Sequence, residues 1–186
     1  MLASALAGQP VAVSAGAAGE PSWTDGQTIF LDPSSDGRAS LESVAVQASL
    51  ISAGSLANDV VTSLVRHPRL ARRYLAVESH RALAANRALL PPTLSALFDA
   101  EVAGISDSPE DSLSIAATKK EIGDPPAAFG TIRAKKLMAA NSRVSEREAL
   151  AHVPRRESRD ALEELDDGEV DDTDDPDLFT SPVGGG

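Results

Sequence analysis

The sequence contains no cysteine, and that absence removes several kinds of chemistry at once. Disulfide bonds, thiolate zinc sites and cysteine nucleophiles are all excluded. Aromatic residues make up only 3% of the chain, so any core must be built from aliphatic side chains. Many of these are leucine and alanine, which lose little conformational entropy in a helix. The composition therefore predicts a mostly helical protein with an aliphatic core.

Long apolar runs are also missing. No stretch reaches the length of about 18 apolar residues that a membrane-spanning helix needs. The apolar start of the chain has no Lys or Arg before it, and Gly8, Gln9 and Pro10 interrupt it, which is unlike a signal peptide. Together with the absence of cysteine, this pattern fits a reducing compartment, and we expect a cytoplasmic protein without a membrane span.

Charge is unevenly distributed along the chain. Residues 157–177 hold 12 of the 28 acidic residues and one of the 17 basic ones, so most of the net charge of -11 is local. The remainder is balanced and lacks the cation excess that nucleic-acid binding requires. We expect residues 1–140 to form a domain and residues 141–186 to be an acidic, disordered linker or tail.

Two segments near the start have the composition of strands. Residues 10–16 alternate β-branched and small side chains. Residues 23–31 are the clearest β signal, and Asp25-Gly26 within them is a dipeptide typical of type I′ turns, in which Gly26 supplies a positive φ. We therefore expect a small β-hairpin or edge strand ahead of the helices.

Apolar residues at steps of three and four predict helices along most of the remaining chain. Ser40 is the expected N-cap of the first of these helices, and Gly54 follows its end. Ser108 and Pro109 are expected at the start of another. The predicted helices span 41–53, 58–65, 68–89, 93–102, 111–122 and 132–138. The fold class is therefore α+β and predominantly helical, with a helical bundle after the hairpin.

Histidines and carboxylates do not assemble into a recognisable active site. No two of His67, His80 and His152 have the four-residue spacing that places two imidazoles on one helix face for zinc. No phosphate-binding loop or nucleophile elbow occurs. We predict no catalytic, cofactor or metal site. Four carboxylates could still pair across helices for acid–base chemistry: Glu42, Glu78, Asp99 and Glu101. A simpler explanation is that Glu42 lies in the first turn of a helix, where it complements the helix dipole, and that Asp99 and Glu101 face solvent.

Arginines gather around the longest predicted helix. Arg69 and Arg73 are four residues apart and would lie on one helix face. Such a face could bind an acidic partner or the acidic tail of the same chain, or it could simply be solvated. The candidate interaction face consists of Arg66, Arg69, Arg72 and Arg73, with Arg81 and Arg87 further along the helix.

Four stretches carry the strongest family signal: residues 23–31, 46–51, 54–56 and 74–81. With them, residues 10–105 resemble the amino-terminal region of the nitric oxide reductase activation protein (NorD) family. That family belongs to the von Willebrand factor A (VWA) proteins that work beside MoxR-type AAA+ ATPases. The resemblance implies a zincin-like metallopeptidase fold, in which an edge strand precedes a helix bearing H-[EQ]-x-x-H. A later helix in that fold carries an E-D-x-R-like motif.

In this chain, the resemblance places Val46 and Leu50 at the two histidine positions and Gln47 at the Glu/Gln position. Val and Leu have no lone pair for zinc, and an amide cannot replace a carboxylate as general base. The resemblance therefore implies a degenerate metallopeptidase domain, in which Val46 and Leu50 serve as core residues.

In the later helix, the resemblance places Glu78 at the glutamate position, Ser79 at the acidic position and Arg81 at the arginine position. Glu78 alone cannot hold a metal ion. The same resemblance implies a VWA domain beyond this chain, because no D-x-S-x-S motif occurs within it. The expected function is then a non-catalytic scaffold that helps a MoxR-type ATPase activate a client metalloenzyme. The alternatives are a freestanding helical interaction protein with a regulatory acidic tail, and a hydrolase that uses carboxylates.

Overall fold

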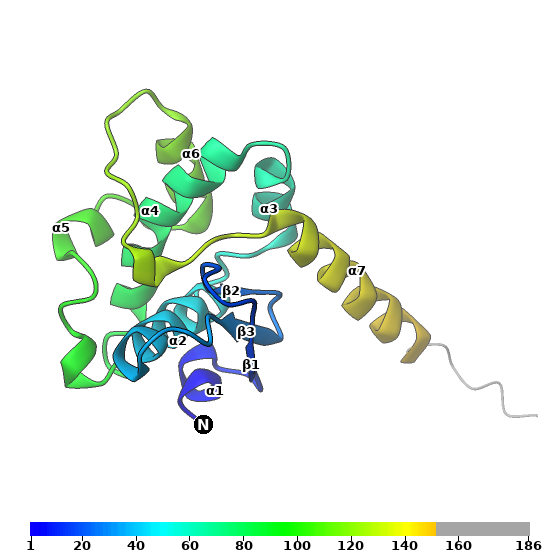
Figure 1. Cartoon of the computed structure of the whole chain (residues 1–186). Helices are drawn as coiled ribbons and strands as arrows, with labels where there is room; N and C mark the ends of the chain where they lie inside the picture. The colour runs from blue at the N-terminus through cyan, green and yellow to red at the C-terminus, as the bar shows by residue number, and fades with distance from the viewer. Residues whose placement is uncertain (152–186) are drawn as a thin grey trace, which may run out of the picture. The chain divides into compact units, whose positions relative to one another are not determined.

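A computed structural model describes residues 1–151 of the chain, and the predicted acidic segment at 157–177 lies outside them. The fold of these residues is α+β and mostly helical, as the sequence predicts (Figure 1). The elements are α1 (Leu2–Ala7), β1 (Ala12–Ala15), β2 (Trp23–Thr24), β3 (Thr28–Leu31), α2 (Gly37–Ser52), α3 (Asn58–Leu64), α4 (Pro68–Ala85), the 3-10 helix η1 (Pro92–Leu94), α5 (Ala100–Ala103), α6 (Pro109–Ala117), the 3-10 helix η2 (Ala127–Phe129) and α7 (Ala134–Ala151).

The three strands form one small mixed sheet in the order β1-β3-β2. β1 is parallel to β3, and β2 is antiparallel to it. Gly26 has the predicted positive φ of 92°. The turn lies one residue later than predicted, because Thr24 pairs with Ile29 and the Asp25 N–H donates to the Thr28 carbonyl at 3.2 Å. Its central residues are therefore Gly26 and Gln27. The Asp25 carboxylate organises this turn by accepting hydrogen bonds from the N–H groups of Gln27 and Thr28 at 3.0 and 2.7 Å.

Helix α2 begins earlier than predicted. Its N-cap is Asp36, whose carboxylate accepts a hydrogen bond from the Ala39 N–H at 2.7 Å, so the assignment of Ser40 as N-cap is wrong. Glu42 therefore lies beyond the first turn, where it pairs with Arg38 at 2.9 Å.

The end of α2 follows the prediction. Gly54 adopts a positive φ of 70°, and the Ser55 N–H reaches back to the Leu50 carbonyl at 3.1 Å, which is a Schellman motif.

Several helix boundaries differ from the expectations. The helix predicted over 93–102 is two short helices, η1 and α5, because Asp99 caps a new start there. The predicted Ser108 cap of α6 is confirmed by a 3.1 Å hydrogen bond from the Asp111 N–H. Helix α6 ends at Ala117 rather than at residue 122, and α4 ends at Ala85 rather than at residue 89. Helix α7 extends far beyond the predicted 132–138 and continues across the domain boundary expected at residue 141.

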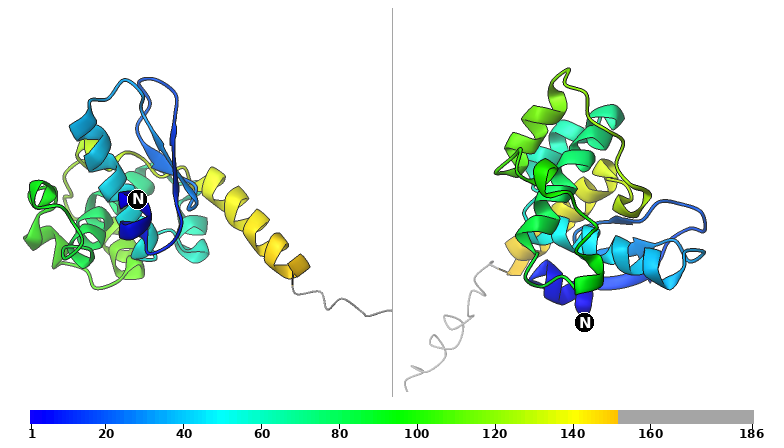
Figure 2. Two further views of the ribbon diagram at one scale, coloured as in Figure 1. Left: turned by 90° about the horizontal axis from the view of Figure 1, so that it is seen from below. Right: turned by 90° about the vertical axis from the view of Figure 1, so that its left-hand side faces the viewer.

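Helix α2 lies at the centre, with α1 and the sheet on one side and α4 on the other (Figures 1 and 2). Its buried residues Val46 and Leu50 share one apolar cluster with Leu6 of α1, Leu83 of α4 and Phe129 of η2. A second cluster joins α3, the first half of α4, α6 and the start of α7. Within residues 1–151, none of the helices combines the length and apolarity that a bilayer crossing requires.

Candidate functional site: a buried carboxylate network and a surface groove

Glu78 lies on α4 with its side chain fully buried. Its Oε1 accepts a hydrogen bond from the Ser55 hydroxyl at 2.5 Å, and its Oε2 accepts one from the Ser112 hydroxyl at 2.6 Å. Arg81, one turn further along α4, donates to the same two oxygens from Nη2 and Nε at 2.5 and 2.8 Å. The Glu78 carboxylate is therefore paired with the Arg81 guanidinium, and both of its oxygens are hydrogen-bonded inside the protein.

This network joins three separate parts of the fold. Ser55 is placed by the Schellman turn after α2, and Ser112 comes from α6. The Tyr74 hydroxyl donates to the Ser55 carbonyl at 2.8 Å, and Arg81 donates to the Ala53 carbonyl at 3.2 Å. Burial raises the pKa of Tyr74, and the Glu78 charge raises it further, so the phenol stays protonated. The arrangement holds helices together and leaves Glu78 no spare acceptor for a substrate.

The three positions that the resemblance assigns to a metallopeptidase motif lie in the core. Val46, Gln47 and Leu50 are at most 1% exposed. The Gln47 amide donates to the Phe129 carbonyl at 2.8 Å, and the Ser43 hydroxyl donates to the Ala128 carbonyl at 3.2 Å. The chain's own η2 segment therefore covers the face of α2 on which a catalytic carboxylate would have to meet substrate.

The later motif residues are buried or engaged as well. Ser79 is fully buried, and its hydroxyl has no hydrogen-bond partner among the described residues. His80 accepts a hydrogen bond on Nδ1 from the Asp99 N–H at 2.9 Å, and its ring lies edge-on to Phe129 with 4.9 Å between centroids. Burial lowers the pKa of His80, and the nearby Asp99 charge only partly opposes this effect. A neutral His80 that fixes the start of α5 is a structural residue.

The remaining titratable candidates are scattered. His67 is exposed, as are Asp99 and Glu101, and His152 lies outside the described residues. Over the described part of the chain, no group of three or more His, Asp or Glu side chains is placed to hold a metal ion. The carboxylates considered for acid–base chemistry do not converge, because Glu42 pairs with Arg38, Glu78 pairs with Arg81 and Asp99 caps α5.

The four arginines of the predicted interaction face have different environments. Arg66 and Arg69 are exposed. Arg72 pairs with Asp124 at 2.9 Å, with both side chains largely in solvent. Arg73 donates to the carbonyls of Ala116, Thr118 and Lys120 at 2.7 to 2.9 Å and so closes the end of α6. Sequence spacing placed Arg69 and Arg73 together but could not show that Arg73 is used by a second helix.

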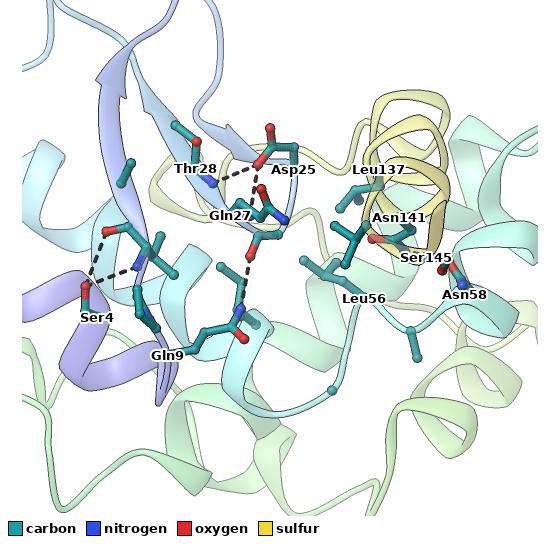
Figure 3. Close-up of a pocket in the computed structure, with 18 residues that line it drawn as sticks. Ser4, Gln9, Asp25, Gln27, Thr28, Leu56, Asn58, Leu137, Asn141 and Ser145 are labelled. Carbon is teal, nitrogen blue, oxygen red and sulfur yellow. Dashed lines mark hydrogen bonds between the residues drawn. The ribbon is translucent and has the colours of Figure 1, made fainter. Parts of the chain in front are cut away.

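A groove of about 1020 Å³ lies on the surface beside the sheet (Figure 3). Most of its lining comes from four segments that are far apart in sequence: residues 9–12, 25–28, 54–58 and 137–145. Ser4 and Ile51 complete it. Because no single segment carries the groove, local sequence patterns give no signal for it. Only the folded chain brings these walls together.

Hydrogen bonds fix the walls of the groove to one another. The Gln9 amide donates to the Gly26 carbonyl at 3.1 Å, and the Asn141 amide donates to the Asn58 amide oxygen at 2.6 Å. Asp25 is the one charged residue among the lining residues described, and its carboxylate is occupied within its own loop. A groove of this size, with apolar side chains, amide groups and a single carboxylate, suits an extended peptide without an excess of negative charge.

Comparison with known proteins adds no relative: no family model, no curated protein and no solved structure matches this chain. The likeness to the NorD family therefore rests on the residues quoted for it above.

Proposed function

We propose that this chain is a non-catalytic scaffold or interaction module of a VWA protein that works with a MoxR-type AAA+ ATPase to mature or activate a client metalloenzyme. The class of partner comes from the family resemblance. The observation that carries the non-catalytic role is the buried hydrogen bond from the Gln47 amide to the Phe129 carbonyl. The position that a general base would occupy in the motif is thus taken by an amide whose N–H group already donates to a backbone carbonyl.

A zinc hydrolase needs ligands with lone pairs, a carboxylate base and an open coordination position. Val46 and Leu50 are aliphatic and sit in an apolar cluster, so they supply no ligands. Glu78 has an arginine and two serine hydroxyls on its oxygens. Each element of the chemistry is thus replaced by packing or by an internal hydrogen bond, which favours a scaffold.

The groove is the proposed binding surface of this scaffold. Its volume of about 1020 Å³ lies at the upper end of the usual range of ligand pockets, about 300 to 1,000 Å³. Its polar lining groups, such as the Gln9 and Asn141 amides, can exchange hydrogen bonds with a peptide backbone. The half-buried side chains of Leu56 and Val11 supply apolar surface for side chains. An extended segment of the ATPase or of the client is the occupant that fits this lining.

Metal content tests the non-catalytic role. We expect the full chain, after incubation with zinc and desalting, to retain far less than one zinc ion per molecule by elemental analysis, because the motif positions hold no ligands. Glu78→Ala should not change that value. Stoichiometric zinc that disappears in Glu78→Ala would contradict the proposal.

Charge introduced into the groove tests the binding surface. Gln27 and Ser145 are exposed lining residues whose side chains make no hydrogen bonds among the described residues. The double variant Gln27→Arg/Ser145→Arg should weaken binding to the MoxR-type ATPase of the same organism by about tenfold or more, measured by biolayer interferometry. The steric and electrostatic block should leave the circular dichroism spectrum unchanged.

The matched control is Ser95→Arg/Ser114→Arg, which adds the same charge at exposed sites on η1's C-cap and α6, away from the groove. It should bind within about twofold of the unmodified chain, since single exposed charges contribute little. Equal weakening in both variants would point to net charge rather than to the groove. Absence of any binding by the unmodified chain would reject the ATPase as partner.

A further inference from the structure

A second surface depression, separate from the groove, lies between the start of α4 and the end of α6. It has a volume of about 550 Å³ and contains four basic side chains and no acidic one among its lining residues. The residues that matter for its chemistry are Arg66, His67, Arg69, Leu70, Arg73 and Ala117.

The basic residues of this depression differ in how they are held. Arg66 and Arg69 are exposed and form no ion pair with any described residue, so their guanidinium groups are open to a ligand. Arg73 is fixed at the inner side by three carbonyls, and its charge remains there. Two exposed guanidinium groups thus lie beside one fixed cation, next to apolar surface from Leu70 and Ala117.

The local charge opposes the charge of the whole chain. Most of the formal net charge of -11 lies in residues 157–177, and the remainder of the chain is balanced, so these cations form a local feature and not a basic surface. A polyanion such as nucleic acid, which contacts many cations over a long surface, is therefore disfavoured. A short acidic segment senses mainly the nearest charges, since exposed charges are screened beyond about 10 Å at 0.1 M salt.

We propose that this depression binds an acidic peptide segment of a partner protein. Carboxylates of the segment pair with Arg66 and Arg69, whose planar guanidinium groups suit bidentate contacts. An apolar side chain between those carboxylates packs on Leu70 and Ala117. This surface goes beyond the proposed scaffold role, because it does not depend on the groove or on the identity of the ATPase.

The test uses the full chain and a fluorescein-labelled ten-residue peptide of aspartates around a central leucine, with fluorescence anisotropy as readout. Arg66→Glu/Arg69→Glu should weaken binding by about tenfold or more, because attraction becomes repulsion at both contacts. Arg38→Glu/Arg87→Glu, which makes the same charge change at exposed sites elsewhere, should stay within about twofold. Addition of salt to about 0.5 M should also weaken binding of the unmodified chain.

Three outcomes would overturn the proposal. Equal binding of a matched peptide with asparagine in place of aspartate would remove the carboxylates from the recognition. Equal loss in the two double variants would reduce the effect to net charge. Markedly tighter peptide binding, once the carboxylates of residues 157–177 are changed to amides, would assign the surface to the chain's own acidic segment instead of a partner. The groove variant Gln27→Arg/Ser145→Arg should bind this peptide normally, which separates the two surfaces.

Discussion

Glu78→Ala is expected to lower the free energy of unfolding by about 3 to 5 kcal/mol, the usual effect of removing one partner of a buried ion pair. The substitution leaves the Arg81 guanidinium, only 14% exposed, without its counter-charge. It also strands the Ser55 hydroxyl, which donates to Glu78 at 2.5 Å in a fully buried position. Urea denaturation followed by circular dichroism measures the loss.

The same pair offers a sharper comparison. Glu78→Leu/Arg81→Met removes both charges and fills the space with apolar atoms, so we expect a smaller loss than in Glu78→Ala alone, by about 2 kcal/mol or more. The control Glu101→Ala changes an exposed carboxylate and should stay within about 0.5 kcal/mol of the unmodified chain. A Glu78→Ala protein as stable as the control would show that the network contributes nothing to stability.

Gly130→Ala is expected to destabilise the fold by about 3 kcal/mol or more, because strain and a backbone clash act together. Gly130 has φ 70° and ψ -134°, a region that residues with a Cβ rarely enter. A Cβ built there would lie 2.0 Å from the Ser22 carbonyl oxygen and 3.1 Å from the Gln47 amide nitrogen. The nearest atoms belong to the Ser22 backbone, so rotation of a side chain cannot relieve the clash.

Alanine substitutions at two other glycines separate the cost of backbone strain from the cost of the steric clash. Gly54 shares a φ of 70° but has open space around the Cβ position, so Gly54→Ala should cost only about 1 to 2 kcal/mol. Gly123 has neither problem, and Gly123→Ala should stay within about 0.5 kcal/mol. Thermal and urea unfolding of the three variants should rank them in that order. A Gly130→Ala protein no less stable than Gly54→Ala would contradict the close approach to Ser22.

Elements with a local chemical signal were predictable from the sequence. Gly54 marks the end of α2 because only glycine readily adopts its left-handed conformation, and Ser108 with Pro109 marks the start of α6. The strand at 28–31 follows from β-forming residues next to a turn. These features depend on a few neighbouring residues, which is why the mostly helical α+β class could be anticipated.

The predicted helix boundaries are wrong where tertiary contacts, or two competing capping residues, determine where a helix begins or ends. Asp36 and Ser40 are both good N-caps, and the packing of α2 against α1 and the sheet is compatible with the earlier start. α7 is longer than its apolar pattern suggests, since polar residues can extend a helix that is already anchored at one end by Leu137. Helix α1 was missed because six residues carry too short a pattern to detect.

In the candidate site, too, properties of single side chains could be predicted from the sequence and long-range contacts could not. That Val46 and Leu50 cannot bind zinc follows from their side chains alone. That Gln47 donates to Phe129, and that Arg73 closes α6, depends on partners 82 and more than 40 residues away. The groove depends on four such distant segments. Contacts between residues so far apart in sequence leave no signal in the spacing of neighbouring residues.

The cover that η2 forms over α2 also has a consequence for folding order. Gln47 meets Phe129 across 82 residues of chain, and the Thr131 N–H closes onto the Ser22 carbonyl at 2.8 Å. Contacts between such distant residues carry the largest loop-closure entropy and form late. During synthesis, α2 and α4 can pair before residue 131 has left the ribosome. The face of α2 that bears Gln47 is therefore uncovered in the nascent chain until residues 127–131 have emerged.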